Sequence, residues 1–178
     1  FSAVPTILQF LLQIPVGQAD ISSLKNAVCG AAPLSVKLFN DFESHAGVEL
    51  VEGYGFTEGT CVNSLNPPKG TRKIGSIGLR IPFHYMKSVV LDDDGKYLRD
   101  AKINEIGVIV ARGKNIFLGY KETIHNKHMW GNDGEHQWYN TGDLGKEDED
   151  HYFWLTGRKK ELIIRGGHNI DPKSIEEP

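Results

Sequence analysis

A change in the pattern of apolar residues, after the first third of the 178-residue chain, constrains the fold more than any other feature. Before it, segments of helix and strand length alternate: an apolar segment at residues 5–12, a strand at residues 24–30, and a helix that Ser35 caps and that runs to His45. Gly47 follows, as glycine commonly does at a helix end. Such alternation predicts an α/β unit with parallel strands.

A different pattern begins near Asn66. Short β-branched runs at residues 85–91 and 107–112 are separated by turn clusters that include residues 67–70 and 92–95. This pattern predicts an antiparallel β-rich unit with its own alternating apolar residues. We expect that unit to form a barrel-like core.

A polar linker at residues 156–161 marks a third change, because a short apolar strand and two glycines follow it. We therefore expect an α/β subdomain at residues 1–66, a β-rich subdomain at residues 67–157, and a hinge with the start of a further domain at residues 158–178. Asp171 and the proline after it open a helix that the sequence does not complete, so the chain is expected to be an internal fragment.

Composition limits the classes of partner. The formal net charge is -3, with acidic and basic residues mixed along the chain, so there is no large positive field to attract nucleic acid. The longest apolar run, residues 7–14, is far shorter than the roughly 20 residues of a membrane span. Cys29 and Cys61 are far apart and lack ligand spacing, which indicates neither a disulfide framework nor a zinc site. We expect a cytoplasmic location.

The segment from Glu52 to Thr60 is the first candidate site, because it follows an apolar strand and holds three glycines. Ligands of open α/β sheets bind at the carboxyl ends of strands, where glycine lets the backbone approach a phosphate. Thr57 could donate to a phosphate oxygen, and Glu58 could hold Mg²⁺. The alternative, which this segment alone favours, is a glycine-rich turn whose Thr and Glu satisfy local backbone groups.

Two further candidates follow along the chain. Asp143 comes after a Thr-Gly pair at the expected start of a strand, where it could accept hydrogen bonds from both ribose hydroxyls or simply cap a turn. Arg158 lies in a cationic segment and could fork two bonds to phosphate or ribose oxygens, whereas Lys160 is a flexible point charge better suited to a hinge. That cationic segment could also be a solvated strand edge.

Taken in order, five segments resemble the adenylate-forming superfamily of acyl-CoA synthetases, luciferases and peptide-synthetase adenylation domains. The segment at residues 104–120 departs from the family pattern, because Asn104 stands where glycine is usual. The five segments are residues 30–35, 54–58, 104–120, 139–143 and 157–167. The resemblance implies the C-terminal part of the large adenylate-forming domain, an α/β sheet portion followed by a distorted antiparallel β-barrel, with a hinge and the first strand of the small C-terminal domain.

In this family a carboxylate attacks the α-phosphate of ATP to give an acyl adenylate and pyrophosphate, and coenzyme A then displaces AMP. The resemblance implies catalytic roles for Thr57 on phosphate, Glu58 on Mg²⁺, Arg158 on ribose and phosphate, and Lys160 as hinge. It also implies nucleotide, acyl and pantetheine contacts for Gly30, Ala31, Ala32, Tyr54, Gly55, Asp143, Gly166 and Gly167. Among these, Tyr54 stacks on adenine and Asp143 takes the ribose hydroxyls.

Two parts of the family's machinery do not occur in the sequence: the phosphate loop that ends in Lys, and the catalytic Lys of the C-terminal domain. We therefore expect no adenylation by the chain alone. The segment at residues 165–177 resembles fatty or aryl acyl-CoA synthetases most. The alternatives are a non-catalytic nucleotide-binding or interaction module, and an acyl-AMP ligase that loads a carrier protein. We also expect the α/β part to expose apolar surface and self-associate.

Overall fold

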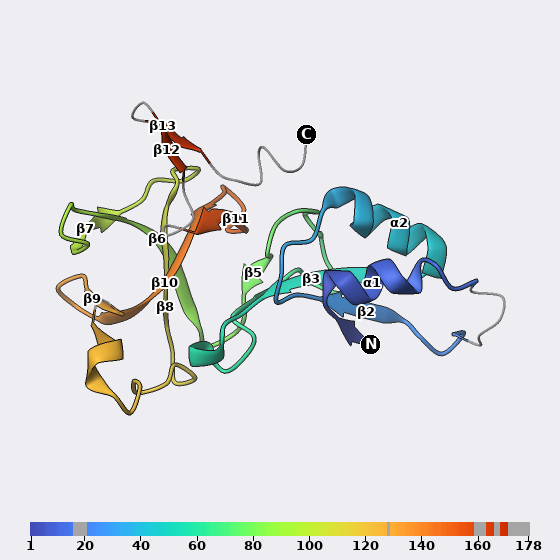
Figure 1. The fold of residues 1–178 in the computed structure, drawn as a ribbon, viewed down its shortest axis with the longest axis horizontal. Coiled ribbons are helices and arrows are strands. Elements are labelled where there is room, and N and C mark those ends of the chain that lie inside the picture. Colours follow the sequence, from blue (N-terminus) through green and yellow to red (C-terminus); the bar gives the residue numbers. More distant parts are fainter. Residues whose placement is uncertain (16–20, 128, 159–162, 166–167, 171–178) are drawn as a thin grey trace. The chain divides into compact units, whose positions relative to one another are not determined.

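The computed structural model describes residues 1–15, 21–127, 129–158, 163–165 and 168–170. These residues form two compact units, which divide between Ile81 and Pro82 (Figure 1). We call them unit 1 and unit 2 and describe each by itself. No helix in the described ranges is long and apolar enough to cross a membrane.

The described part of unit 1 is built on a mixed sheet with the strand order β1-β2-β3-β4-β5. The first three strands are parallel, and β4 and β5 continue the sheet antiparallel to β3. The expected α/β arrangement with parallel strands is confirmed here. The strands are β1 (Ser2–Ala3), β2 (Asn26–Cys29), β3 (Glu49–Tyr54), β4 (Ser64–Leu65) and β5 (Leu79–Arg80).

Helices α1 (Pro5–Leu11) and α2 (Val36–Ala46) cover these strands, and α2 begins and ends as the sequence predicts. The Ser35 hydroxyl accepts a hydrogen bond from the Leu38 amide at 3.2 Å, which satisfies one of the free donors of the first turn. Gly47 ends the helix in the left-handed conformation, with φ 63°. Both boundaries therefore follow from local side-chain chemistry.

The core of unit 1 joins the two helices to the parallel strands. Leu8 of α1 is fully buried, and Phe39 and Phe42 lie three residues apart on the inner face of α2. They pack in one cluster with side chains of β2 and β3. The remaining buried members are Ala27, Cys29, Leu34, Leu38, Val48 and Leu50.

The described part of unit 2 is an antiparallel sheet with the order β11-β10-β8-β6-β7, and β9 pairs with β10 (Figure 1). The β-rich prediction is confirmed. The expected barrel is not closed among the described strands, because β11 and β7 stand at opposite ends of the order. The strands are β6 (Tyr85–Leu91), β7 (Tyr97–Asp100), β8 (Gly107–Arg112), β9 (Trp130–Asn132), β10 (Gln137–Glu147) and β11 (Phe153–Arg158).

Two short strands and two short helices complete the described structure. β12 (Ile163–Arg165) pairs antiparallel with β13 (His168–Ile170), so the apolar strand expected there is present over the described residues. The short 3₁₀ helices are η2 (Thr57–Gly59) in unit 1 and η3 (Thr123–Asn126) in unit 2.

One face of the unit 2 sheet combines an apolar cluster with cations held over aromatic rings. Lys87 Nζ lies 4.5 Å from the centre of the Trp138 ring, and the Arg112 guanidinium lies 5.1 Å from the same centre. Lys87 also pairs with Asp133 at 2.8 Å. The buried apolar side chains beside them are Val89, Val108 and Val110. The Lys87 charge on this face is therefore paired, whereas the buried Arg112 Nε has no hydrogen-bond partner among the described residues.

Candidate active site

In unit 1 the first candidate site is the edge at which β2 and β3 end. The strands are parallel and Cys29 is the register partner of Glu52, so the residues that follow β2 and β3 emerge at the same edge of the sheet. Gly30 is so close to β3 that a Cβ there would lie 2.8 Å from the Gly53 carbonyl oxygen. The structure thus brings Gly30, Ala31 and Ala32 to the same edge as Tyr54.

The residues after β2 are open to solvent. Ala31 and Ala32 are exposed, and Ala31 has a φ of 67°. A left-handed alanine costs about 1 kcal/mol, so this loop holds a backbone conformation that alanine rarely adopts. Such a conformation persists only where surrounding contacts impose it, and backbone strain of this kind is often found at ligand sites.

The residues after β3 form a tight turn that carries Thr57 and Glu58. The Gly59 amide donates to the Phe56 carbonyl at 3.0 Å, and the Thr60 amide donates to the Thr57 carbonyl at 3.2 Å. Thr57 is exposed and Glu58 is partly exposed. Their hydroxyl and carboxylate are therefore placed at the end of the strand by a turn of backbone hydrogen bonds.

The glycines of this segment have reasons to be glycine within unit 1. A Cβ at Gly55 would lie 1.3 Å from the Cys61 carbonyl oxygen, and one at Gly53 would lie 2.7 Å from Leu65 Cδ1. These contacts give the turn interpretation a structural basis that needs no ligand. Phosphate binding by the same backbone remains a prediction.

Tyr54, the residue assigned to adenine stacking, is largely buried at the end of β3. Its ring centre lies 5.9 Å from that of Phe56, and the two planes are tilted by 54°. This distance is within the range of favourable aromatic pairs. Tyr54 and Phe56 therefore form an aromatic pair at this edge of the sheet.

The chemistry of Glu58 fits a magnesium ion that is shared with phosphates. The described residues contain no group of three or more His, Cys, Asp or Glu side chains that could hold a metal. Mg²⁺ prefers oxygen ligands and commonly binds one or two carboxylates together with substrate phosphates rather than a complete protein cage. A single carboxylate at the end of a strand suits that mode of binding.

In unit 2 the structure brings Asp143 and Arg158 together. They are register partners on β10 and β11, and Arg158 Nε donates to Asp143 Oδ1 at 2.9 Å. The Asp143 side chain is 9% exposed and the Arg158 side chain is 65% exposed. The pair therefore combines an almost buried acceptor with a guanidinium that reaches solvent.

The predicted position of Asp143 at the start of a strand was wrong. Asp143 lies inside β10, where the pairing with β8 shifts register between Asn140 and Leu144. The Thr141 hydroxyl donates to the Ile109 carbonyl at 2.8 Å and accepts from the Asp143 amide at 3.1 Å, while Gly142 adopts a φ of 76°. The Thr-Gly pair thus forms a bulge, which lets one continuous strand pass through it.

Three predicted residues lie outside the described residues: Lys160, Gly166 and Gly167. The hinge role of Lys160 and the pantetheine role of the two glycines stay predictions.

The sequence interpretation missed a buried polar network behind the turn of unit 1. Asn63, Asn66 and Ser76 have almost no exposed surface. Asn66 Nδ2 donates to the Ser76 carbonyl at 2.7 Å, and the Asn66 side-chain oxygen accepts from the Lys73 amide at 3.0 Å. Two asparagines within a short stretch that also holds apolar residues were the available signal, because buried amides must find such partners.

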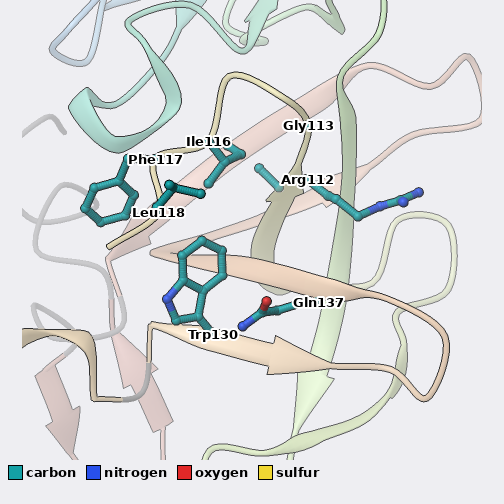
Figure 2. Close-up of a pocket in the computed structure, with 8 residues that line it drawn as sticks. Arg112, Gly113, Ile116, Phe117, Leu118, Trp130 and Gln137 are labelled. Carbon is teal, nitrogen blue, oxygen red and sulfur yellow. The ribbon is translucent and has the colours of Figure 1, made fainter. Parts of the chain in front are cut away.

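Unit 2 also has a pocket of about 210 Å³ beside the loop that follows β8 (Figure 2). None of the predicted site residues lines it. In Figure 2 the Arg112 side chain extends away from Trp130 and from the 116–118 loop. The lining residues are Ala111, Arg112, Gly113, Ile116, Phe117, Leu118, Trp130 and Gln137.

Comparison with known proteins finds relatives that are CoA ligases. It is 45% identical over 176 residues to the marinolic acid–CoA ligase of Pseudoalteromonas sp., covering 99% of this chain and 26% of the relative. It is 36% identical over 178 residues to a long-chain-fatty-acid–CoA ligase of Bacillus subtilis, covering 99% and 30%. The chain thus spans about a third or less of these curated relatives.

Solved structures of two further proteins also match nearly all of this chain. ATP-bound MatB from Rhodopseudomonas palustris matches with a TM-score of 0.82 and 32% identity, over 98% of this chain and 34% of that one. The anthranilate CoA ligase AuaEII in complex with anthranoyl-AMP matches with a TM-score of 0.82 and 26% identity, over 99% and 33%. The family model described as AMP-binding enzyme matches residues 1–121, more than half of the chain. The chain therefore belongs to the AMP-binding enzyme family, the adenylate-forming family of the acyl-CoA synthetases.

Proposed function

We propose that this chain is part of an acyl-CoA synthetase. The complete enzyme activates a carboxylic acid with ATP to an acyl adenylate and transfers the acyl group to coenzyme A. The observation that carries the proposal is the cross-strand pair of Asp143 and Arg158, at positions that the family resemblance assigns to the nucleotide. A carboxylate held in one orientation by a guanidinium is well placed to accept hydrogen bonds from both ribose hydroxyls.

Unit 1 contributes the phosphate and metal contacts in this proposal. Thr57 donates its hydroxyl to a phosphate oxygen, Glu58 shares Mg²⁺ with the phosphates, and Tyr54 stacks on adenine. Gly30, Ala31, Ala32 and Gly55 line the adenine and acyl pocket. Mg²⁺, when bound, supplies positive charge that offsets the charge of the phosphates.

Unit 2 and the segment after it contribute the ribose contacts and the domain motion. Asp143 binds the ribose hydroxyls, and Arg158 orients Asp143 and assists with ribose and phosphate. Lys160 serves as the hinge between the two half-reactions, and Gly166 and Gly167 leave room for the pantetheine arm. We retain the division into segments 1–66, 67–157 and 158–178 as part of the proposal.

The names of the relatives guide the substrate class. They include ligases for marinolic acid, long-chain fatty acids and indoleacetate. We propose a fatty or aryl carboxylate as substrate and coenzyme A, rather than a carrier protein, as acceptor. We further propose a cytoplasmic enzyme without a nucleic-acid partner.

We propose that the 178-residue chain by itself has no adenylation activity, because it spans about a third or less of the cited relatives. We also propose that the isolated chain self-associates. In unit 1 the apolar side chains of Phe1, Ile7, Phe10 and Ile14 are about half exposed, which favours association.

The test is ATP-dependent pyrophosphate release by the full-length protein that contains this chain, with a panel of fatty and aryl carboxylates. We expect release that depends on the acid and that collapses in Glu58→Gln and in Asp143→Ala. The control is Asp41→Asn, which removes an exposed carboxylate that pairs with Lys37 on α2. No release with any acid would favour the non-catalytic module, and acyl transfer only to a carrier protein would favour the alternative acceptor.

A further inference from the structure

Asn63 connects the turn that carries Thr57 and Glu58 to the sheet of unit 1. Its backbone amide donates to the Tyr54 carbonyl at 2.8 Å, and its carbonyl accepts from the Ile81 amide at 3.1 Å. Its side-chain Nδ2 donates to the Gly59 carbonyl at 3.4 Å. One fully buried residue therefore touches the end of β3, the last residue of η2 and the residue after β5.

The Asn63 side chain also packs directly against the turn. A Cβ at Gly59 would lie 2.5 Å from Asn63 Nδ2, 2.7 Å from Asn63 Oδ1 and 2.6 Å from the Phe56 ring. The amide and the ring thus leave room for a hydrogen atom only. Because Gly59 directly follows Glu58, this contact bears on the residue next to the proposed metal ligand.

The backbone of the turn is strained. Thr60 and Cys61 have φ values of 58° and 79°, so two consecutive non-glycine residues are left-handed. Each costs on the order of 1 kcal/mol, and such conformations persist only where surrounding contacts impose them. Asn63 supplies such contacts on the side of the turn that faces the sheet.

We propose that Asn63 is a positioning residue for the adenylation reaction. Through the Gly59 carbonyl and its packing against Gly59, it fixes the turn so that the Glu58 carboxylate and the Thr57 hydroxyl keep the placement that the metal–nucleotide complex requires. This inference rests on the proposed function, which gives Glu58 and Thr57 their roles. The competing explanation is that Asn63 only contributes to the stability of unit 1, like any satisfied buried amide.

A matched variant separates these explanations. Ser64, the next residue, is equally buried, and its hydroxyl donates to the Ile77 carbonyl at 2.8 Å rather than to the turn. In the full-length protein we compare Asn63→Ala with Ser64→Ala. The measurements are kcat, the KM of the carboxylate, the Mg²⁺ concentration that gives half the maximal rate, and the melting temperature.

We expect Asn63→Ala to lower kcat roughly 10- to 100-fold, because a displacement of about 1 Å in a positioning group can cost that much. The half-maximal Mg²⁺ concentration should rise, whereas the KM of the carboxylate should not change. Ser64→Ala should lower the melting temperature but leave kcat and the Mg²⁺ dependence unchanged. If both variants lose activity in parallel with their melting temperatures, Asn63 has no positioning role.

A second variant changes Gly59, the other residue of the Asn63–Gly59 contact. Gly59→Ala should displace the Asn63 amide and raise the half-maximal Mg²⁺ concentration as Asn63→Ala does. The double variant should be less impaired than the product of the two single effects, because removing the amide relieves part of the clash. Independent, multiplicative effects would contradict the proposal.

The folded fraction of each variant is checked by circular dichroism, and Asn63→Ser replaces Asn63→Ala if the latter does not fold. Failure of the proposed function can be told apart from failure of this inference. A full-length protein that releases no pyrophosphate with any acid overturns both proposals. An active protein in which the Asn63 and Ser64 variants behave alike overturns only the role of Asn63.

Discussion

The two candidate regions hold their side chains by different means. In unit 1, Thr57 and Glu58 stand on a turn whose shape depends on backbone close approach, since Gly55 lies against the Cys61 carbonyl. In unit 2, Asp143 and Arg158 come from adjacent strands and hold each other by a charged hydrogen bond. We therefore expect added side-chain atoms to disturb the turn of unit 1, and the loss of a charge to disturb the Asp143–Arg158 pair of unit 2.

The chain carries separate reporters for the two regions. Both cysteines lie in unit 1 and all three tryptophans lie in unit 2. Cys29 is fully buried, and burial, assisted by the charge of Glu52, raises the pKa of its thiol to about 11. Cys29 should therefore be alkylated only when unit 1 opens. Tryptophan fluorescence should follow unit 2.

The largest effect is expected for Gly55→Ala. The added methyl group would meet the Cys61 carbonyl at 1.3 Å, and because that atom belongs to the backbone, the whole turn must move. We expect a loss of about 3 kcal/mol or more from the stability of unit 1. The loss is measured as faster alkylation of Cys29 and as a lower urea concentration at which half of Cys29 becomes accessible to alkylation. The urea unfolding curve followed by tryptophan fluorescence should not change.

Gly47→Ala is the control for this prediction. Gly47 is also left-handed, but nothing lies within 4 Å of its added Cβ, so only the conformational cost of about 1 kcal/mol applies. Equal effects of the two substitutions would show that the close approach at Gly55 is not what holds the turn.

Local patterns predicted the elements well and the contacts between distant residues poorly. The Ser35 cap and Gly47 gave the limits of α2, and the β-branched runs gave β6 and β8, because those signals lie within the elements themselves. The pairing of Asp143 with Arg158 depends on the register of β10 against β11 and on a bulge, which no local pattern encodes.

The role proposed for Asn63 in unit 1 also could not be predicted from local sequence patterns. Its importance comes from contacts with Tyr54, Gly59 and Ile81, which lie on separate parts of the chain. A sequence pattern can mark an asparagine among apolar residues as unusual, but it cannot tell which carbonyl the amide will reach.

An intermediate effect is expected when charge is removed from Asp133 in unit 2. Lys87 and the backbone amides of Glu135 and His136 hold the pKa of the Asp133 carboxyl well below its usual range. Trp138 Nε1 also donates to this carboxylate, at 2.6 Å. Asp133→Asn should cost about 2 kcal/mol at pH 7, the scale of hydrogen bonds to a charged group.

The pH dependence gives the sign of this effect. Because the folded pKa of Asp133 is depressed, its stabilisation is fully present above the unfolded pKa of about 3.9 and is lost as the pH falls below it. The urea midpoint of tryptophan fluorescence in the wild-type chain should therefore fall between about pH 5 and pH 3 more steeply than in Asp133→Asn. Parallel curves would mean that Asp133 is not the group responsible.

The smallest effect on stability is expected for Arg158→Ala. The Arg158 side chain is 65% exposed, so water screens its attraction to Asp143, and the loss should be about 1 kcal/mol by tryptophan fluorescence. Arg99→Ala is the matched control, because Arg99 also pairs with a carboxylate of unit 2, that of Glu105. In the full-length protein Arg158→Ala should weaken ATP binding and Arg99→Ala should not. A small loss of stability together with weaker ATP binding in Arg158→Ala would support the proposed role of the Asp143–Arg158 pair in nucleotide binding. Equal ATP affinities of the two variants would contradict that role.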